Sequence, residues 1–303
     1  MNLNLALDQS SPSDFSDEHV FGKNDRLWAV RVSAEDARPF IAQAPVCGAL
    51  SRYRIAHAGV HDASFPYSVV RTNLSGTFFL ACLGGEGRVL ADGKWQRVTA
   101  GTAFLLLPHM LNAFHTVKGR RWTFCWVRFD EPPNQQPSIA ATSPRLAKFG
   151  AKPLQHAILG LHEDCLSGGS PETIHHWVEL IHDYVHAFAR PWQRDDRLSQ
   201  LWEKVAAHLD AKWNVEQLAQ VAHVSSEHLR RLCNRELGRS PMHHVTFLRM
   251  KRAAQLLAET GLKVEHIAAE VGYRDPFVFS KTFKKWTGWR PSDFPGRRHR
   301  TTH

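Results

Sequence analysis

The chain contains no apolar run of the about 18 residues that a membrane-spanning helix requires. Its first residues, MNLNLALDQSSPSDFSDEHVF, have neither the basic nor the apolar segment of a secretory signal. The five cysteines, at positions 47, 82, 125, 165 and 233, form no Cys-x-x-Cys pair, which is typical of reduced thiols and speaks against a structural zinc site. We therefore expect a cytoplasmic protein that has no membrane partner.

The net charge of +9 lies almost entirely in the last third of the chain. Residues 201–303 contain 18 basic and 10 acidic residues, whereas the first 200 residues contain 20 and 19. Such a distribution indicates a domain that binds a polyanion, joined to a nearly neutral domain. A solvated basic face without a partner would carry the same charge, so the charge alone leaves both interpretations open.

Changes in residue pattern divide the chain into four segments. The polar residues 1–22 predict a flexible N-terminal arm, and short apolar runs broken by glycines predict a β-sandwich or β-barrel within residues 23–135. Among these runs, Asp92-Gly93 has the composition of a two-residue hairpin turn. Residues 136–195 begin as a proline-rich linker and continue as helices, and residues 196–303 are helical. The expected fold class is α+β, with an N-terminal β-barrel, following helices and an all-α C-terminal domain.

One predicted helix, which starts at Pro171, carries a wide apolar stripe. Its members recur at helical spacing, and they are Ile174, Trp177, Val178, Ile181, Val185 and Phe188. The stripe either packs on the barrel of its own chain or pairs with a second subunit. Residues 136–195 therefore include candidate dimerisation helices.

The C-terminal third contains an internal repeat. Leu218-Ala219 matches Ile267-Ala268 at an offset of 49 residues. After one inserted residue, Leu229, Cys233 and Gly238 match Phe279, Phe283 and Gly288 at an offset of 50. Each unit has a short helical segment, a turn and a longer helical segment, which is the layout of a helix-turn-helix.

The second unit, in VGYRDPFVFSKTFKKWTG (271–288), separates apolar from cationic side chains. Gly272 suits a sharp turn, Asp275 suits the N-cap of the next helix, and Pro276 suits its first turn. Phe279, Phe283 and Trp286 recur as a buried face. The outer face is then formed by Phe277, Val278, Lys281, Lys284 and Lys285. A helix with such a face fits the major groove of DNA.

The first unit follows the same pattern. Ser225 or Ser226 caps its second helix, and Leu229, Leu232 and Leu237 form the buried face. Its outer face consists of Glu227, His228, Arg230, Arg231, Asn234 and Arg235. Arginines in this position are suited to bidentate contacts with guanine or phosphate.

Residues 205–296 resemble the DNA-binding domain of AraC-type transcription regulators, most closely in HIAAEVGYRDPFVFSKTFKKWTGWRPSDF (266–294). The resemblance implies that residues 240–260 form a long linking helix and that the two outer faces contact successive major-groove segments of double-stranded DNA. It places Lys284 and Lys285 on phosphates, and Arg249 and Arg252 either in support of the linking helix or on the DNA backbone. His223 departs from the family, because it stands at a turn where glycine is usual and should cost about 1 kcal/mol there.

Residues 25–135 resemble, more loosely, the cupin-like ligand-binding and dimerisation domain of the same family, through GGEGRVLADGK, AGTAFLLLPHM and RRWTFCWVRF. The resemblance implies a homodimer and a small-molecule effector, for which a sugar is one candidate, with RNA polymerase as a further partner. Aromatic faces and polar groups that could bind such a ligand are Trp95, Trp122, Trp126, Arg54, Arg71, His109 and Arg128. The alternative is that the tryptophans only fill the barrel core.

A cupin-type enzyme with an accessory helical domain is the competing hypothesis. A cupin metal site needs a His-x-His pair, a carboxylate and a later histidine, and the residues before the glycine-rich turn, RTNLSGTFFL, contain no such pair. We therefore expect no metal, no cofactor and no enzymatic activity. A regulator whose front domain only dimerises, without an effector, remains open.

Overall fold

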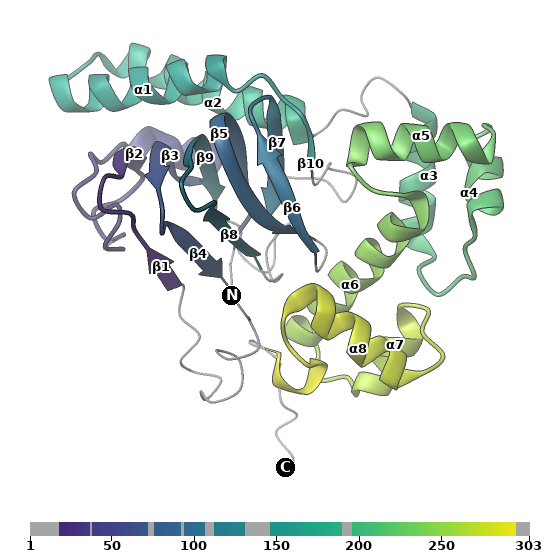
Figure 1. Ribbon diagram of the computed structural model, residues 1–303. Helices are drawn as coiled ribbons and strands as arrows, with labels where there is room; N and C mark the ends of the chain where they lie inside the picture. Colours follow the sequence, from purple (N-terminus) through teal and green to yellow (C-terminus); the bar gives the residue numbers. More distant parts are fainter. Residues whose placement is uncertain are drawn as a thin grey trace.

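The computed structural model describes residues 18–36, 38–71, 76–91, 94–106, 112–130, 146–189 and 196–294. A curled antiparallel sheet lies beside a group of helices, and two further helices cover the sheet (Figure 1). The predicted α+β class is confirmed. Asp92-Gly93, His109 and the linker over 131–144 lie outside the described residues. In the described ranges, no helix combines the length and the apolar character that crossing a membrane requires.

The sheet follows the strand order β1-β4-β8-β5-β9-β3-β2, with β6 and β7 paired to β5 and β10 paired to β7. Its strands are β1 (Glu18–Val20), β2 (Arg26–Arg31), β3 (Ile55–Ser64), β4 (Ser68–Arg71), β5 (Phe78–Ala91), β6 (Lys94–Thr99), β7 (Thr102–Leu106), β8 (Asn112–Thr116), β9 (Arg121–Phe129) and β10 (Leu146–Lys148). The last residues of the expected N-terminal arm thus belong to the sheet, because β1 pairs with β4.

The curvature of the sheet comes from β5, which changes partners along its length. Its first half pairs with β7 and β9, and its second half pairs with β6 and β8. The register shifts between Cys82 and Gly84, and Gly85 has a positive φ of 74°. A Cβ at Gly85 would lie 1.9 Å from the carbonyl oxygen of Arg121, so only glycine allows the strand to bend here.

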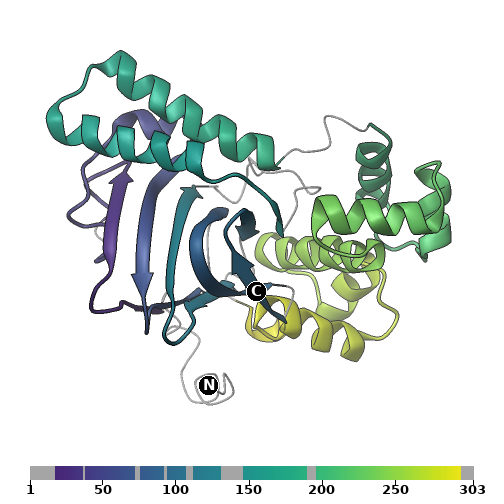
Figure 2. The ribbon, with the colours of Figure 1, turned by 45° about the horizontal axis from the view of Figure 1, so that its top comes forward.

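Two helices, α1 (Lys152–Ser167) and α2 (Pro171–Ala189), lie across the outer face of the sheet (Figure 2). The apolar stripe of α2 faces the same chain, since Val178, Ile181 and Val185 are at most 1% exposed. The ring of Phe188 lies 5.2 Å from that of Phe79 on β5. Of the two alternatives for the stripe, the structure shows packing on the barrel of its own chain.

The helical group consists of α3 (Asp196–Ala207), α4 (Val215–Val221), α5 (Ser226–Leu237), α6 (Pro241–Glu259), α7 (Val264–Glu270) and α8 (Pro276–Thr287), followed by the 3-10 turn η4 (Pro291–Asp293). The pairs α4–α5 and α7–α8 are the two predicted helix-turn-helix units, and α6 is the predicted linking helix. The group contacts the sheet where α5 ends. A Cβ at Gly238, which has a φ of 69°, would lie 2.1 Å from the carbonyl oxygen of Leu146.

Candidate nucleic-acid interface

The first helix-turn-helix unit is shaped by local hydrogen bonds. The amide of His228 donates to the Ser225 side chain at 3.2 Å, so Ser225 is the N-cap of α5. His223, in the turn, has a φ of 53°. The prediction that a non-glycine residue occupies a left-handed conformation here is confirmed. Leu229 and Leu237 are fully buried and fix the inner face of α5.

The second unit repeats this arrangement with different residues. Gly272 has a φ of 83° at the turn, and the amide of Phe277 donates to the Asp275 carboxylate at 2.7 Å. Pro276 occupies the first turn of α8, as its sequence predicts. The inner face consists of Phe279, Phe283 and Trp286, which are 0%, 0% and 4% exposed.

The linking helix α6 is held by an arginine. The Nε of Arg249 donates to the carbonyl of Leu209 at 3.0 Å, and its Nη2 donates to the carbonyl of Ala211 at 2.8 Å. Its guanidinium also lies 5.7 Å from the ring centre of Tyr273. Arg249 thus connects α6 with the segment before the first unit and with the turn of the second. Of the two roles expected from the sequence, support of the linking helix or contact with the DNA backbone, the structure shows the first.

The outer face of α5 carries the six residues that the sequence placed there. Glu227, Arg230, Arg231, Asn234 and Arg235 are exposed, and His228 is half-buried. Nη2 of Arg231 lies 2.9 Å from Nδ1 of His228, so these two side chains contact each other on the surface of α5. Arg235 forms an ion pair with Glu236, the next residue along the helix. Since Arg230 and Arg231 project from a helix with a buried opposite side, they are available to a ligand outside the protein.

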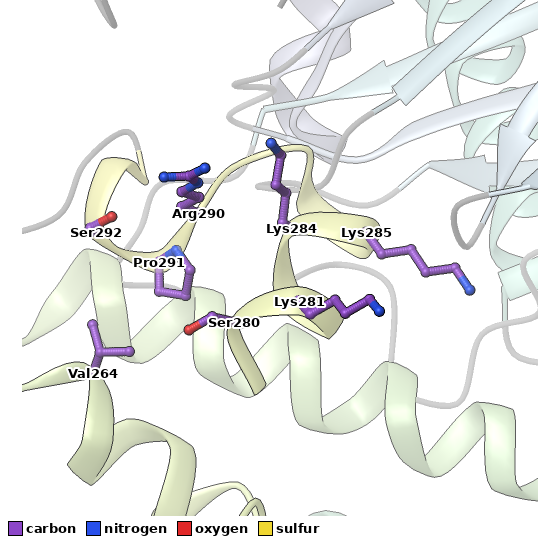
Figure 3. Close-up of a pocket in the computed structure, with 8 residues that line it drawn as sticks. All are labelled: Val264, Ser280, Lys281, Lys284, Lys285, Arg290, Pro291 and Ser292. Carbon is purple, nitrogen blue, oxygen red and sulfur yellow. The ribbon is translucent and has the colours of Figure 1, made fainter. Parts of the chain in front are cut away.

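The outer face of α8 is cationic along its length and apolar at its start. Lys281, Lys284 and Lys285 are exposed, and so are Phe277 and Val278. The three lysines border a hollow of about 460 Å³ together with Arg290, which follows α8 (Figure 3). Arg290 was not among the interface residues predicted from the sequence. Its signal was present, because it lies in the same signature segment, two residues after the glycine that ends the helix.

The interior of the barrel contains a second cavity, of about 10 Å³. This is about the space that one water molecule needs. Two of the predicted ligand residues, Arg71 and Trp126, line it. The other lining residues are His19, Phe21, Leu27, Phe40, His61, Tyr67, Phe78 and Phe124.

The remaining predicted ligand residues are not brought together at this cavity. Trp122 is fully buried, and its indole N–H donates to Sγ of Cys82 at 3.3 Å. Trp95 is 40% exposed and lies 4.8 Å from the ring of His115, while Arg54 is exposed after η2 (Gly48–Tyr53). Arg128 is half-buried at the end of β9. Of the three tryptophans, only Trp126 contributes to the cavity.

Burial controls the charge of the cavity walls. Desolvation lowers the pKa of His61 to about 4 and that of His19 to about 3, with the charge of Arg71 acting in the same direction on His19. Burial also raises the pKa of the Tyr67 hydroxyl. The Arg71 guanidinium lies 4.5 Å from the ring centre of Phe78. At neutral pH the two histidines are therefore uncharged, and Arg71 is the cationic side chain among the lining residues.

Known protein families match both the sheet and the helical group of this chain. Residues 57–232 match the AraC-like ligand binding domain, and residues 218–297 match a helix-turn-helix domain family. The chain is 25% identical over 214 residues to the lactose operon transcription activator of Staphylococcus xylosus, covering 66% of this chain and 77% of that protein. It is 29% identical over 234 residues to the MmsAB operon regulatory protein of Pseudomonas aeruginosa, covering 71% of this chain and 74% of that protein.

A solved structure, that of ToxT from Vibrio cholerae, aligns with 79% of this chain and 98% of its own, at 13% identity and a TM-score of 0.38. The family assignment does not depend on that likeness, because the ligand-binding family alone matches more than half of the chain. The second matched family covers the two units whose geometry is described above. The chain belongs to the AraC family of transcription regulators, which join an AraC-like ligand-binding domain to a helix-turn-helix DNA-binding domain.

Proposed function

We propose that this regulator recognises one DNA site with both helix-turn-helix units, through the outer faces of α5 and α8. The observation that carries the proposal is that both helices have two different faces. Each helix buries an apolar face in the domain and exposes cationic side chains on the opposite face. In this proposal the C-terminal domain of residues 196–303 binds the DNA. The basic surplus found in the sequence then has a defined partner, the phosphate backbone.

The exposed side chains divide into two kinds of contact. Lys284, Lys285 and Arg290 lie around the open hollow at the end of α8, where they would neutralise phosphates and fix the position of the protein. Arg231 and Lys281 are placed nearer the middle of their helices and would contact base edges. Glu227, His228, Arg230, Asn234 and Arg235 complete the proposed interface of α5, with the exposed positions of Phe277 and Val278 at the start of α8.

The barrel, by the same proposal, binds a small-molecule effector at the cavity between Arg71 and Trp126. Because the cavity is small, a ligand must displace part of its wall. His19 belongs to the three-residue edge strand β1, and Phe21 directly follows that strand. β1 belongs to the expected N-terminal arm of residues 1–22, so movement of β1 would couple the ligand to that arm. The effector then shifts the population of arrangements that the DNA-binding domains adopt.

Two effector classes suit these walls. The name of the lactose operon activator supports a sugar, and aromatic rings beside polar groups are suitable for a polyol. The buried guanidinium of Arg71 in the cavity wall is suited to bind a small organic acid. A thermal-shift screen of the full chain with sugars and carboxylic acids decides between them, because a ligand stabilises the protein that binds it.

The assembly and the partners of the regulator follow the family. We include a homodimer of the cytoplasmic protein and contact with RNA polymerase in the proposal, with residues 136–195 as the segment that joins the domains. The experiment that tests the DNA interface is selection of a binding site from random duplexes with the full chain, followed by replacement of Arg231 with alanine. Loss of discrimination at one base pair, by about 1–3 kcal/mol, supports the role of Arg231. An equal loss on random DNA contradicts it.

A further inference from the structure

The start of α8 exposes two neighbouring apolar side chains. Phe277 is 86% exposed and Val278 is 53% exposed, the highest exposures of large apolar residues in the described part of the helical group. They directly follow the N-cap Asp275 and Pro276, so the backbone that presents them is held by the cap. Phe277 and Val278 thus form a small exposed apolar patch at the start of α8.

The fold itself does not require apolar residues at these two positions. At the offset of 50 residues that relates the two units, Phe277 corresponds to Glu227, and Val278 corresponds to His228. The first unit forms the same capped helix with these polar residues. The core of α8 is supplied instead by Phe279, Phe283 and Trp286. The difference between the units therefore concerns what each helix contacts.

The neighbouring charges identify the partner. Lys281 lies one turn after Phe277 and Val278, and Lys284 and Lys285 lie one turn further, all exposed. A partner must therefore be polyanionic and must also offer apolar groups at a depth that a helix reaches. The major groove of DNA meets both requirements, and its apolar group on the base edges is the C5-methyl of thymine, for which phenylalanine is a suitable contact.

We infer that Phe277 and Val278 recognise thymine through its methyl group, in the part of the DNA site that the second unit contacts. This inference rests on the proposed function, and it names the base that the second unit recognises in its half of the DNA site. The first unit has Glu227 at the matching position, and a carboxylate there suits the amino group of cytosine. The site is accordingly asymmetric, with methyl contacts in one half only.

The test uses a duplex recovered by selection from a random-sequence library with the full chain. Each thymine in it is replaced, one at a time, by deoxyuridine, which lacks only the methyl group. Burial of one methyl group contributes enough to change an equilibrium about fourfold. We expect the Kd to rise about three- to fivefold at one or two thymines in one half, and to remain unchanged elsewhere.

Two variants assign the effect to its residues. In Phe277→Ala, the sensitive thymine should no longer differ from deoxyuridine, whereas Glu227→Ala, at the equivalent position of the first unit, should keep the full difference. Phe277 is exposed, and an unchanged thermal midpoint for its variant checks that the domain still folds. The thymine inference fails if the site is bound tightly but tolerates every deoxyuridine. It also fails if the Phe277→Ala variant keeps the sensitivity to deoxyuridine. In both cases the proposed function still stands. If the chain selects and binds no duplex, the proposed function fails as well.

Discussion

The indole N–H of Trp126 donates a hydrogen bond to Nδ1 of His57 at 2.9 Å, inside the barrel. His57 is fully buried on β3, and Trp126 lies on the neighbouring strand β9. Since Nδ1 accepts this bond, it cannot carry a proton, and desolvation and the nearby Arg38 and Arg71 lower the pKa of His57 well below its ordinary value. The bond therefore requires the neutral imidazole.

The buried histidines make the barrel sensitive to acid. In the unfolded chain His57, His61 and His19 gain a proton near pH 6.5, whereas in the folded chain they do so only at much lower pH, about 4 for His61 and about 3 for His19. The contribution of these neutral histidines to the free energy of unfolding is therefore fully present above pH 6.5, and it is lost as the pH falls below that value. At pH 5, His61 alone should reduce the free energy of unfolding by about 2 kcal/mol. Thermal unfolding of the full chain between pH 8 and pH 5 measures this loss.

A matched pair of variants assigns the acid sensitivity. His57→Asn keeps an acceptor near the position of Nδ1 but has no group to protonate, so its stability should decline less between pH 8 and pH 5. His156→Asn removes an exposed histidine of α1 and should leave the decline unchanged. The explanation fails if His57→Asn has the same pH dependence as the unaltered chain.

The two turns should respond in opposite directions to substitution. Gly272→Ala introduces a Cβ at a φ of 83°, 2.5 Å from the carbonyl oxygen of Leu209, and should lower the free energy of unfolding by more than about 1–2 kcal/mol. His223→Gly removes the strain of a side chain at a φ of 53° and should be neutral or stabilising, by up to about 1 kcal/mol. Urea unfolding measures both. Equal effects of the two changes would show that the turns do not differ as described.

The apolar stripe of α2 should determine folding stability, and not the association of subunits. Ile181→Ala leaves a cavity under α2 and should cost about 2–5 kcal/mol, because Ile181 is fully buried in its own chain. Leu180→Ala, at a neighbouring position that is 40% exposed, should change stability by less than about 0.5 kcal/mol. Light scattering should report the same mass for both variants. A dimer that dissociates in Ile181→Ala without loss of stability contradicts this packing.

The lysines at the end of α8 should determine the salt dependence of DNA binding. If Lys284 and Lys285 each neutralise one phosphate, alanine at either position reduces the slope of log K against log salt concentration by about 0.9. Affinity should fall on all sequences alike, since phosphate contacts carry no sequence information. Lys152→Ala, at the exposed start of α1, is the matched control. A control that weakens binding as much as the α8 variants would indicate a nonspecific effect of charge.

The helical domain could be predicted almost residue by residue because its signals are local. Each of its features lies within a short segment, such as the caps at Ser225 and Asp275 and the apolar spacing of Phe279, Phe283 and Trp286. Because the sequence repeats, a cap and an apolar face occur in both units. The positive φ of His223 was expected because the residue stands at a turn where the family usually has glycine. Such features depend on helix geometry, which the sequence expresses directly.

The barrel cavity could not be predicted in the same way, because it depends on pairing between distant strands. Trp122 and Trp126 lie on the same face of β9, but they occupy different positions along the strand. A Cβ at Gly87 would meet the ring of Trp122 at 2.4 Å, and one at Gly59 would meet the ring of Trp126 at 2.2 Å. Which tryptophan reaches the cavity is thus decided by its cross-strand neighbours. The contribution of His19 follows from the pairing of β1 with β4, for which the polar N-terminal sequence gives no signal.

The central claim is that one chain contacts DNA with two helices at once, and interference footprinting on the selected duplex tests it most directly. We predict two sensitive major-groove segments on one face of the DNA, about 10–10.5 base pairs apart. Arg231→Ala should remove the signal at one base pair of one segment, and Phe277→Ala should weaken the signal in the other segment. A single sensitive segment that both variants affect alike would contradict the account.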